Sequence, residues 1–179
     1  MKPKGLVVFY SRTGTTRKVA EALAKVLDCD LEELRDTRTR AGLPGYLRSG
    51  ADASFGRLTV LEEPEKEPAD YDFVIVGSPV WRLSVSTPVR TYLTLYRGWM
   101  RRMAFFVTES GIGGRRALDQ MASLCCRKPL AELILTRHQV ERGRHLPDVE
   151  RFSQELLDRL AERLRPSAEA EQEAAPPPQ

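Results

Sequence analysis

Short, nearly continuous apolar runs recur along the chain and alternate with segments whose apolar residues fall at helical spacing. The runs are rich in β-branched and aromatic residues, which is typical of strands that are buried on both faces. We therefore expect five strands, at residues 5–10, about 30–34, 71–77, 103–108 and 130–135.

Helical periodicity appears after most of these runs. Val19, Leu23 and Leu27 recur at helical spacing, and Ser86-Thr87-Pro88 combines a hydroxyl cap with a proline in the first turn. The predicted helices begin near Thr15, Thr87, Gly114 and Pro147, and the last of them extends to about Leu164.

Two segments depart from this alternation. In residues 35–68, charged residues and glycine or proline turns interrupt any long periodic pattern, although residues 46–55 favour a short helix. Residues 166–179 are dominated by Ala, Glu and Pro and lack the apolar content for a core, so we expect disorder there. Residues 1–165 are then expected to form one domain of ordinary size.

Strands that alternate with helices predict a parallel sheet, because each parallel connection needs a crossover, and crossovers are right-handed as a rule. The expected fold class is α/β, a three-layer, doubly wound, five-stranded parallel sheet. In such sheets, ligands bind beyond the carboxyl ends of the strands, where the strand order reverses. The loops after the first, third and fourth strands should meet there.

The loop after the first strand has the chemistry of a phosphate site. Residues 11–16 place four hydroxyls, one glycine and several backbone N–H groups between a buried strand and a helix start. The helix dipole and its unpaired N–H groups can hold an anion, and Gly14 allows close approach. An ordinary Ser/Thr-rich turn with a helix cap is the alternative interpretation.

Two common nucleotide motifs are absent from this loop. It lacks the lysine-containing P-loop of nucleotide triphosphatases, and it lacks the three-glycine fingerprint of a dinucleotide site. A monophosphate is the simpler ligand.

Residues 11–16 resemble the flavin mononucleotide (FMN) phosphate loop of flavodoxins, in which Ser or Thr occupies the first, third and sixth positions and Gly the fourth. Residues 77–81 and 108–114 are similar to the loops that flank the flavin ring in that family. The resemblance spans residues 4–136 and implies the strand order 2-1-3-4-5.

The resemblance also implies a cofactor site for FMN. The phosphate would be held by Ser11, Thr13, Gly14, Thr15 and Thr16, with Arg12 helping by charge. The ring would be bordered by Ser78, Pro79, Val80 and Trp81 on one side and by Thr108, Glu109, Ser110 and Gly111 on the other. Trp81 would stack on the ring, and a core position at the sheet edge is its alternative role.

Charge separates this chain from flavodoxin electron carriers, which are usually strongly acidic. The formal net charge is +3, and without residues 166–179 there are 28 basic and 22 acidic residues, a balance of +6. The loop at 108–114 also carries no aromatic residue, so one ring face is expected to be open to a substrate.

Three functions stay open on this basis. The first is an FMN-dependent oxidoreductase that takes hydride from NAD(P)H and reduces a quinone, with Arg82, Arg115 or Arg116 near an anionic substrate or merely solvated. The second is a one-electron carrier docked by a redox partner protein, and the third is a flavin-free interaction module. Oligomerisation stays open as well.

Other classes of function find little support. Arg residues are dispersed without interleaved aromatics, which disfavours nucleic acid, and no apolar run reaches the roughly 20 residues of a membrane span. Cys29, Cys125 and Cys126 match no metal-ligand pattern and are expected to be reduced and structural, and the N-terminus does not resemble a signal peptide. We therefore expect a cytoplasmic protein without a metal site. His138 and His145 are expected at the surface, and no catalytic residue is assigned.

Overall fold

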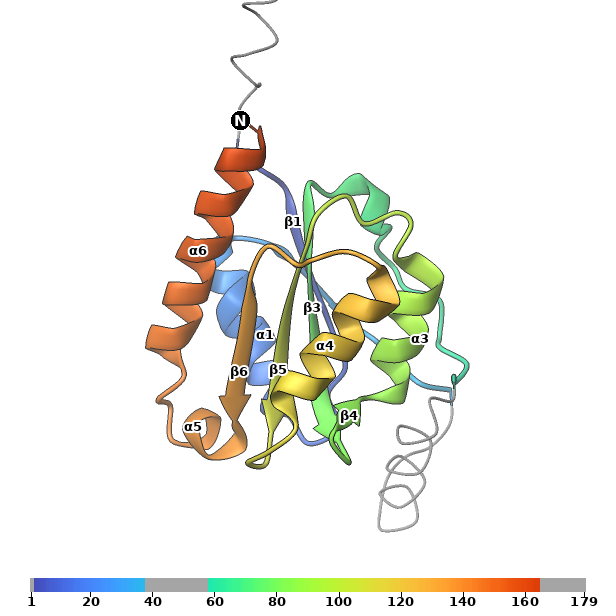
Figure 1. Cartoon of the computed structure of the whole chain (residues 1–179), viewed down its shortest axis with the longest axis vertical. Coiled ribbons are helices and arrows are strands. Elements are labelled where there is room, and N and C mark those ends of the chain that lie inside the picture. Colours follow the sequence, from blue (N-terminus) through green and yellow to red (C-terminus); the bar gives the residue numbers. More distant parts are fainter. Residues whose placement is uncertain (1, 38–57, 165–179) are drawn as a thin grey trace, which may run out of the picture.

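A parallel sheet with the predicted topology forms the centre of the computed structural model, which describes residues 2–37 and 58–164 (Figure 1). Its parallel strands lie in the order β2-β1-β3-β5-β6, which is the predicted order 2-1-3-4-5 when only these strands are numbered. Their bounds are β1 Gly5–Phe9, β2 Asp30–Glu33, β3 Phe73–Trp81, β5 Met103–Glu109 and β6 Glu132–Thr136. The predicted helix at 46–55 and the predicted tail at 166–179 lie outside the described residues.

Helices cover both faces of the sheet, as the three-layer prediction requires. Figure 1 shows α3 and α4 on one face and α1 on the other, with α6 beside α1. Their bounds are α1 Thr15–Leu27, α3 Thr87–Tyr96, α4 Gly114–Cys125, α5 Arg137–Glu141 and α6 Leu146–Leu164, and a 3-10 turn spans Pro68–Asp70.

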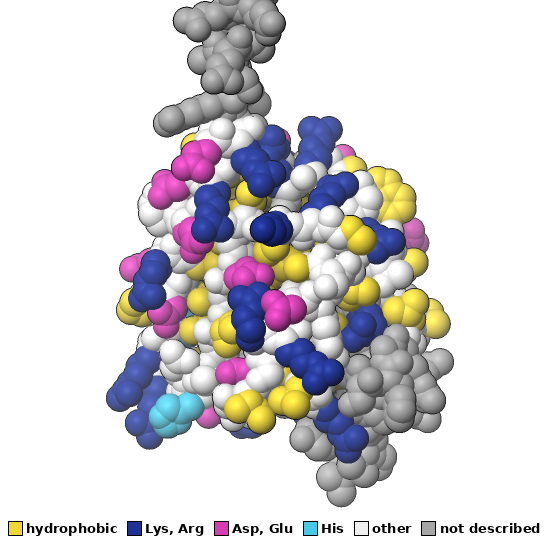
Figure 2. All heavy atoms as spheres, in the orientation of Figure 1, with side chains coloured by type: hydrophobic (Ala, Val, Ile, Leu, Met, Phe, Trp, Pro, Cys, Tyr) yellow, Lys and Arg dark blue, Asp and Glu magenta, His cyan; other side chains and the backbone are white. Residues whose placement is uncertain are grey.

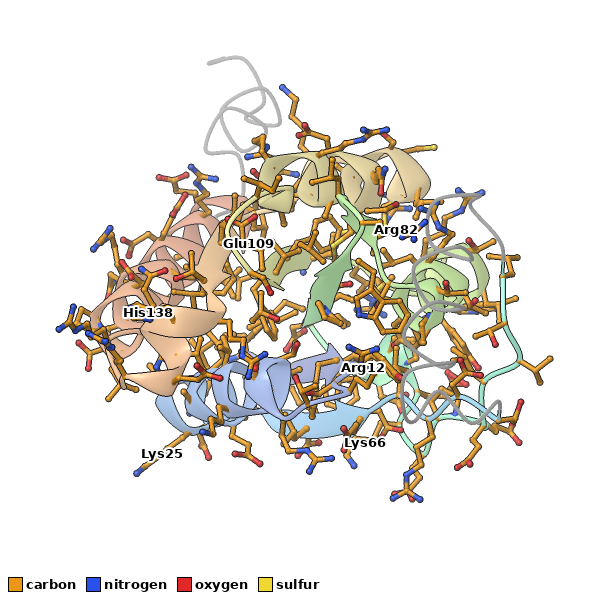
Figure 3. The ribbon with its side chains drawn as sticks, turned by 90° about the horizontal axis from the view of Figure 1, so that it is seen from below. Arg12, Lys25, Lys66, Arg82, Glu109 and His138 are labelled. Atoms are coloured by element: carbon orange, nitrogen blue, oxygen red, sulfur yellow. The ribbon has the colours of Figure 1, made fainter. Side chains whose placement is uncertain are left out.

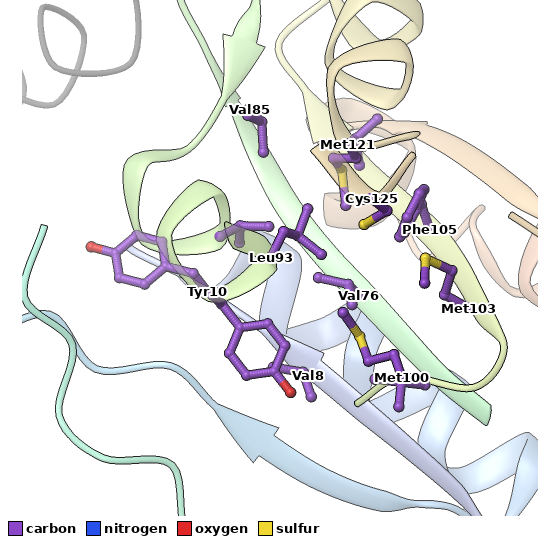
Figure 4. Close-up of a cluster of buried hydrophobic side chains, with 14 of the residues drawn as sticks. Val8, Tyr10, Val76, Val85, Leu93, Met100, Met103, Phe105, Met121 and Cys125 are labelled. Atoms are coloured by element: carbon purple, nitrogen blue, oxygen red, sulfur yellow. The ribbon is translucent and has the colours of Figure 1, made fainter. Parts of the chain in front are cut away.

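The core consists of two clusters, one on each face of the sheet. Along β1, Leu6 and Val8 pack toward α3 and α4, whereas Val7 and Phe9 pack toward α1 and α6. Figure 4 shows the first cluster, in which Phe105 of β5 lies among aliphatic side chains and methionines. Burial on both faces explains why the central strands are continuous apolar runs rather than alternating patterns.

The third strand is longer than its apolar run predicts. It continues to Trp81, turns through Arg82 and Leu83, and pairs antiparallel with the short strand β4, Ser84–Val85. Residues 78–81, predicted as a loop, are therefore strand. No Asn-Gly or Asp-Gly pair marks this turn, and for that reason the sequence gives no hairpin signal.

The short helix α5 is also absent from the prediction. Thr136 and Gln139 form a reciprocal capping box at its start, with Thr136 Oγ1 accepting from the Gln139 N–H and Gln139 Oε1 accepting from the Thr136 N–H. A helix of five residues has too few apolar positions to show a period.

Two of the three thiols fit a structural role. Cys125 is buried at the end of α4 and Cys29 is half-buried, and burial raises the pKa of both thiols to about 11. Both are therefore protonated near neutral pH, which keeps them poor nucleophiles. Cys126, which follows α4 in a left-handed conformation, is exposed.

Basic and acidic side chains are mixed on the surface. Figure 2 shows Lys and Arg spread over this face among Asp and Glu, without a single basic stripe. Within residues 2–37 and 58–164, no helix combines the length and apolar character needed to cross a membrane.

The prediction of two surface histidines is wrong for one of them. His138 is exposed, but His145 is only 8% exposed, just before α6, and its Nδ1 atom has no hydrogen-bond partner among the described residues. Burial, and to a smaller extent the charge of Lys18, lowers the pKa of His145. The position was misjudged because the polar stretch around it resembles an exposed loop.

This burial predicts a pH-dependent stability. Histidine in the unfolded chain has a pKa of about 6.5. As the pH falls, the unfolded chain is therefore protonated at a higher pH than His145 in the folded protein. The stability that depends on neutral His145 is therefore complete above that pH and is lost as the pH falls below it. When the pH is lowered from about 7.5 to about 5.5, we expect the unfolding free energy of His145→Gln to fall less than that of the parent chain. Urea denaturation at each pH measures both values. His138→Gln serves as the control, and an unchanged pH dependence in His145→Gln would contradict the assignment.

Candidate functional site

A cleft of about 250 Å³ lies at the carboxyl end of the sheet, where the three predicted loops meet. Figure 3 looks onto this end of the molecule. The cleft is lined by Arg12, Thr13, Thr15, Thr16, Pro79, Val80, Trp81, Arg82, Thr108, Glu109, Ser110 and Arg137.

The start of α1 opens into this cleft without a cap. Its first flanking residue, Gly14, has a φ of 88°, no side chain of the described residues caps the helix, and its first turn contains no acidic residue. A Cβ atom at Gly14 would meet nothing within 4 Å, so the space beside the loop is open. The first N–H groups of an α-helix lack intrahelical partners, so this end can accept an anion.

Hydroxyl groups fix the loop that leads to α1. Ser11 Oγ accepts a hydrogen bond from the Gly14 N–H at 3.1 Å, which closes the loop on itself. Thr16 Oγ1 and Thr108 Oγ1 are 2.8 Å apart in a buried hydrogen bond that joins the start of α1 to the end of β5. Thr13 and Thr15 line the cleft itself.

Trp81 occupies a core position at the sheet edge and also reaches the cleft. Its ring is 8% exposed, belongs to the core cluster beneath α3 and α4, and also lines the cleft. The edge of its ring system packs against Tyr10 with centroids 5.5 Å apart, and the Arg12 guanidinium lies 5.9 Å from its ring centroid. The indole is therefore held rigidly at the wall.

Ser78 lies behind the cleft rather than on its surface. It is fully buried, and its Oγ accepts from the Ser86 N–H at 3.0 Å and is hydrogen-bonded to Ser86 Oγ at 3.0 Å. The contribution of Ser78 is thus to join β3 to the start of α3. Pro79 and Val80 are half-buried and do form part of the wall.

The opposite wall is the loop between β5 and α4. Glu109 accepts a hydrogen bond from the Gly114 N–H at 2.5 Å, so its carboxylate caps α4. Ser110 and Gly111 are exposed. Gly113 has a φ of 102°, and a Cβ there would lie 2.8 Å from Leu83 Cα, so this loop touches the β3–β4 turn.

The lining is positively charged. It contains the guanidinium groups of Arg12, Arg82 and Arg137 against the single carboxylate of Glu109. Figure 3 shows Arg12 and Arg82 on different sides of this end of the molecule. The sequence prediction missed Arg137, although its place directly after the fifth strand, at a carboxyl end, is a usable signal.

The other two arginines considered near the site do not line it. Arg115 is held in a bidentate ion pair with Glu132, at 2.8 and 2.9 Å, and also binds Asp119. Arg116 is exposed on α4. In the part of the chain that the structure describes, no three His, Cys, Asp or Glu side chains gather in a way that could hold a metal. The cleft is therefore equipped for an anion.

Comparison with solved structures shows the same fold in flavoproteins. A flavoprotein from Lactobacillus acidophilus NCFM in complex with FMN matches with a TM-score of 0.65 at 22% identity, over 78% of this chain and 97% of that chain. The apo form of the flavoprotein from the same organism matches with a TM-score of 0.60 at 22% identity, over 79% and 97%. A flavodoxin from Streptococcus pneumoniae TIGR4 matches with a TM-score of 0.51 at 14% identity, over 86% and 97%.

None of the curated proteins compared with this chain matches it. The sequence model of a family described as Flavodoxin, however, matches residues 4–144, which is well over half of the chain and includes all three loops of the cleft. The chain belongs to the flavodoxin family.

Proposed function

We propose that this protein binds FMN in the cleft and transfers electrons through it. The observation that carries the proposal is the uncapped start of α1, which opens between the hydroxyls of Thr13 and Thr15 beside Gly14. The L. acidophilus flavoprotein of the same fold, which is described in complex with FMN, supports the choice of ligand.

The phosphate of FMN fits the groups at the start of α1. Backbone N–H groups and the helix dipole favour a dianion, and the hydroxyls of Thr13 and Thr15 add donors. Arg12, which lines the same side of the cleft, supplies a full positive charge. No lysine is needed for this arrangement.

The ring of FMN would lie between the two walls of the cleft. Pro79, Val80 and Trp81 form an apolar wall that excludes water. Glu109 and Ser110 line the other side, where their backbone groups would meet the polar edge of the ring. Bound FMN supplies one-electron or hydride chemistry, while the chain binds and orients it. Because Trp81 is anchored in the core, this wall is rigid before the ligand arrives.

For the reaction, we infer an NAD(P)H-dependent reductase that uses a quinone or a similar small acceptor. The positive lining supports approach by an anionic nucleotide. The absence of an aromatic side chain between Ser110 and Gly114 supports access to one face of the ring. The alternative is a one-electron carrier docked by a partner protein, which the rigid, partly buried site would also permit.

A pair of substitutions tests the phosphate site. Thr15→Asp places a carboxylate in the first turn of α1, where it repels a phosphate but interacts favourably with the helix dipole. We expect the dissociation constant for FMN to rise at least about tenfold, while the apoprotein gains about 0.3–1 kcal/mol of stability. Calorimetric titration and thermal denaturation measure the two effects. The uncharged control Thr15→Asn should show a smaller loss of affinity, and equal affinity in Thr15→Asp and the parent chain would refute the site.

Turnover separates the enzyme from the carrier. We expect the FMN-loaded protein alone to oxidise NADPH or NADH steadily with p-benzoquinone as acceptor, because one face of the ring is expected to be open. The measurement is the decay of absorbance of the reduced nucleotide. If oxidation occurs only after a separate flavodoxin reductase is added, the carrier function holds instead.

A further inference from the structure

The turn between β3 and β4 places two side chains where glycine or asparagine is usual. Arg82 and Leu83 form the two-residue connection, with φ values of 47° and 62°. Positive φ at both positions is the geometry of a type I′ hairpin, which strongly favours Asn, Asp and Gly. Arg82 therefore holds a strained conformation at the edge of the cleft, and strained residues of this kind cluster at functional sites.

A network of hydrogen bonds braces this turn. Gln120 Oε1, on α4, accepts from the Val85 N–H at 3.0 Å and from Ser84 Oγ at 2.8 Å. Arg90 Nη2 donates to Ser84 Oγ at 3.1 Å. Together with the contact between Gly113 and Leu83, these bonds fix the backbone from which the Arg82 side chain extends.

The charge of Arg82 is not used by the described part of the protein. Arg82 is exposed, lines the cleft and forms no ion pair or hydrogen bond with another described residue. Arg137, in contrast, pairs with Glu141 at 2.6 Å, and Arg12 lies beside the Trp81 ring. A guanidinium that extends from a fixed backbone at the cleft is therefore available for a second anion.

The FMN phosphate does not require Arg82. The groups proposed to hold that phosphate lie at the start of α1, whereas Arg82 comes from the β3–β4 turn, on a different side of the cleft (Figure 3). A guanidinium fork matches the geometry of a phosphate oxygen pair, and its charge-assisted hydrogen bonds are stronger than neutral ones.

We infer that Arg82 binds a phosphate of the nicotinamide dinucleotide that reduces the bound FMN. This inference rests on the proposed function. The phosphate is either the 2′-phosphate, which only the NADP form carries, or the pyrophosphate, which both forms carry. In either case Arg82 determines how tightly the electron donor binds without contributing to FMN affinity.

The test is a titration of FMN-loaded protein with NADP⁺ and NAD⁺, which bind without reducing the flavin. Arg82→Asn removes the charge and keeps a residue that tolerates the left-handed conformation, and Arg82→Gly provides a second variant that suits the turn. Arg101→Asn removes an exposed arginine before β5, at the opposite end of the sheet, as a matched control. FMN affinity is measured first in every variant, and the nucleotide titrations are then done with FMN at saturation, so that a change in FMN binding is not counted as a change in nucleotide binding.

Each result has a distinct meaning. A loss of about tenfold or more in NADP⁺ affinity, with NAD⁺ unchanged, assigns Arg82 to the 2′-phosphate, and a similar loss for both assigns it to the pyrophosphate. The Arg101→Asn protein should bind both nucleotides as the parent does. If both Arg82 variants bind them as the parent does, or if the FMN-loaded parent binds neither nucleotide, the inference is overturned although FMN binding stands. Failure of the parent to bind FMN would instead overturn the proposed function.

Discussion

The backbone N–H groups at the start of α1 need an acceptor that the described part of the protein does not supply. Two other helix starts have side-chain acceptors: Thr136 caps α5, and the Glu109 carboxylate binds the first N–H of α4. The start of α3 has no side-chain cap, but its first turn contains a proline, which has no N–H to satisfy. Among the described residues, α1 is the helix whose start combines three features: no side-chain cap, open space beside Gly14, and a neighbouring loop rich in Ser and Thr. The start of α1 is thus the part of the fold best suited to bind an anion, and the cleft lies beside it.

The rest of the sheet serves to bring the walls of the cleft to this point. Crossover connections through helices make β1, β3 and β5 run parallel, so that their carboxyl ends meet at one edge. The buried bond between Thr16 and Thr108 then fixes α1 against β5. At the same edge, a Cβ on Gly77 would lie 2.0 Å from the Phe106 ring, so the glycine leaves the space that this buried ring fills. The site is therefore rigid because the core beneath it is closely packed.

Much of this could be predicted from the sequence, because the strongest signals are local. Buried strands appear as continuous apolar runs, and the loop at 11–16 concentrates hydroxyls next to a helix start. What escaped prediction depends on tertiary contacts. The Arg82–Leu83 turn is held by Gln120, some 35 residues away in the chain, and Ser78 is hydrogen-bonded inward to Ser86. His145 is buried although the segment around it is polar. None of these has a periodic or compositional signal.

The comparison of FMN with riboflavin tests the central claim most directly, because the two ligands share the ring system and differ in the phosphate. If the start of α1 is the anchor, FMN binds on the order of a hundredfold more tightly than riboflavin, a difference of ~2.7 kcal/mol in binding free energy. Calorimetric titration of the purified apoprotein with each ligand gives both dissociation constants. Equal affinity for the two ligands, or no binding of FMN, would contradict the account.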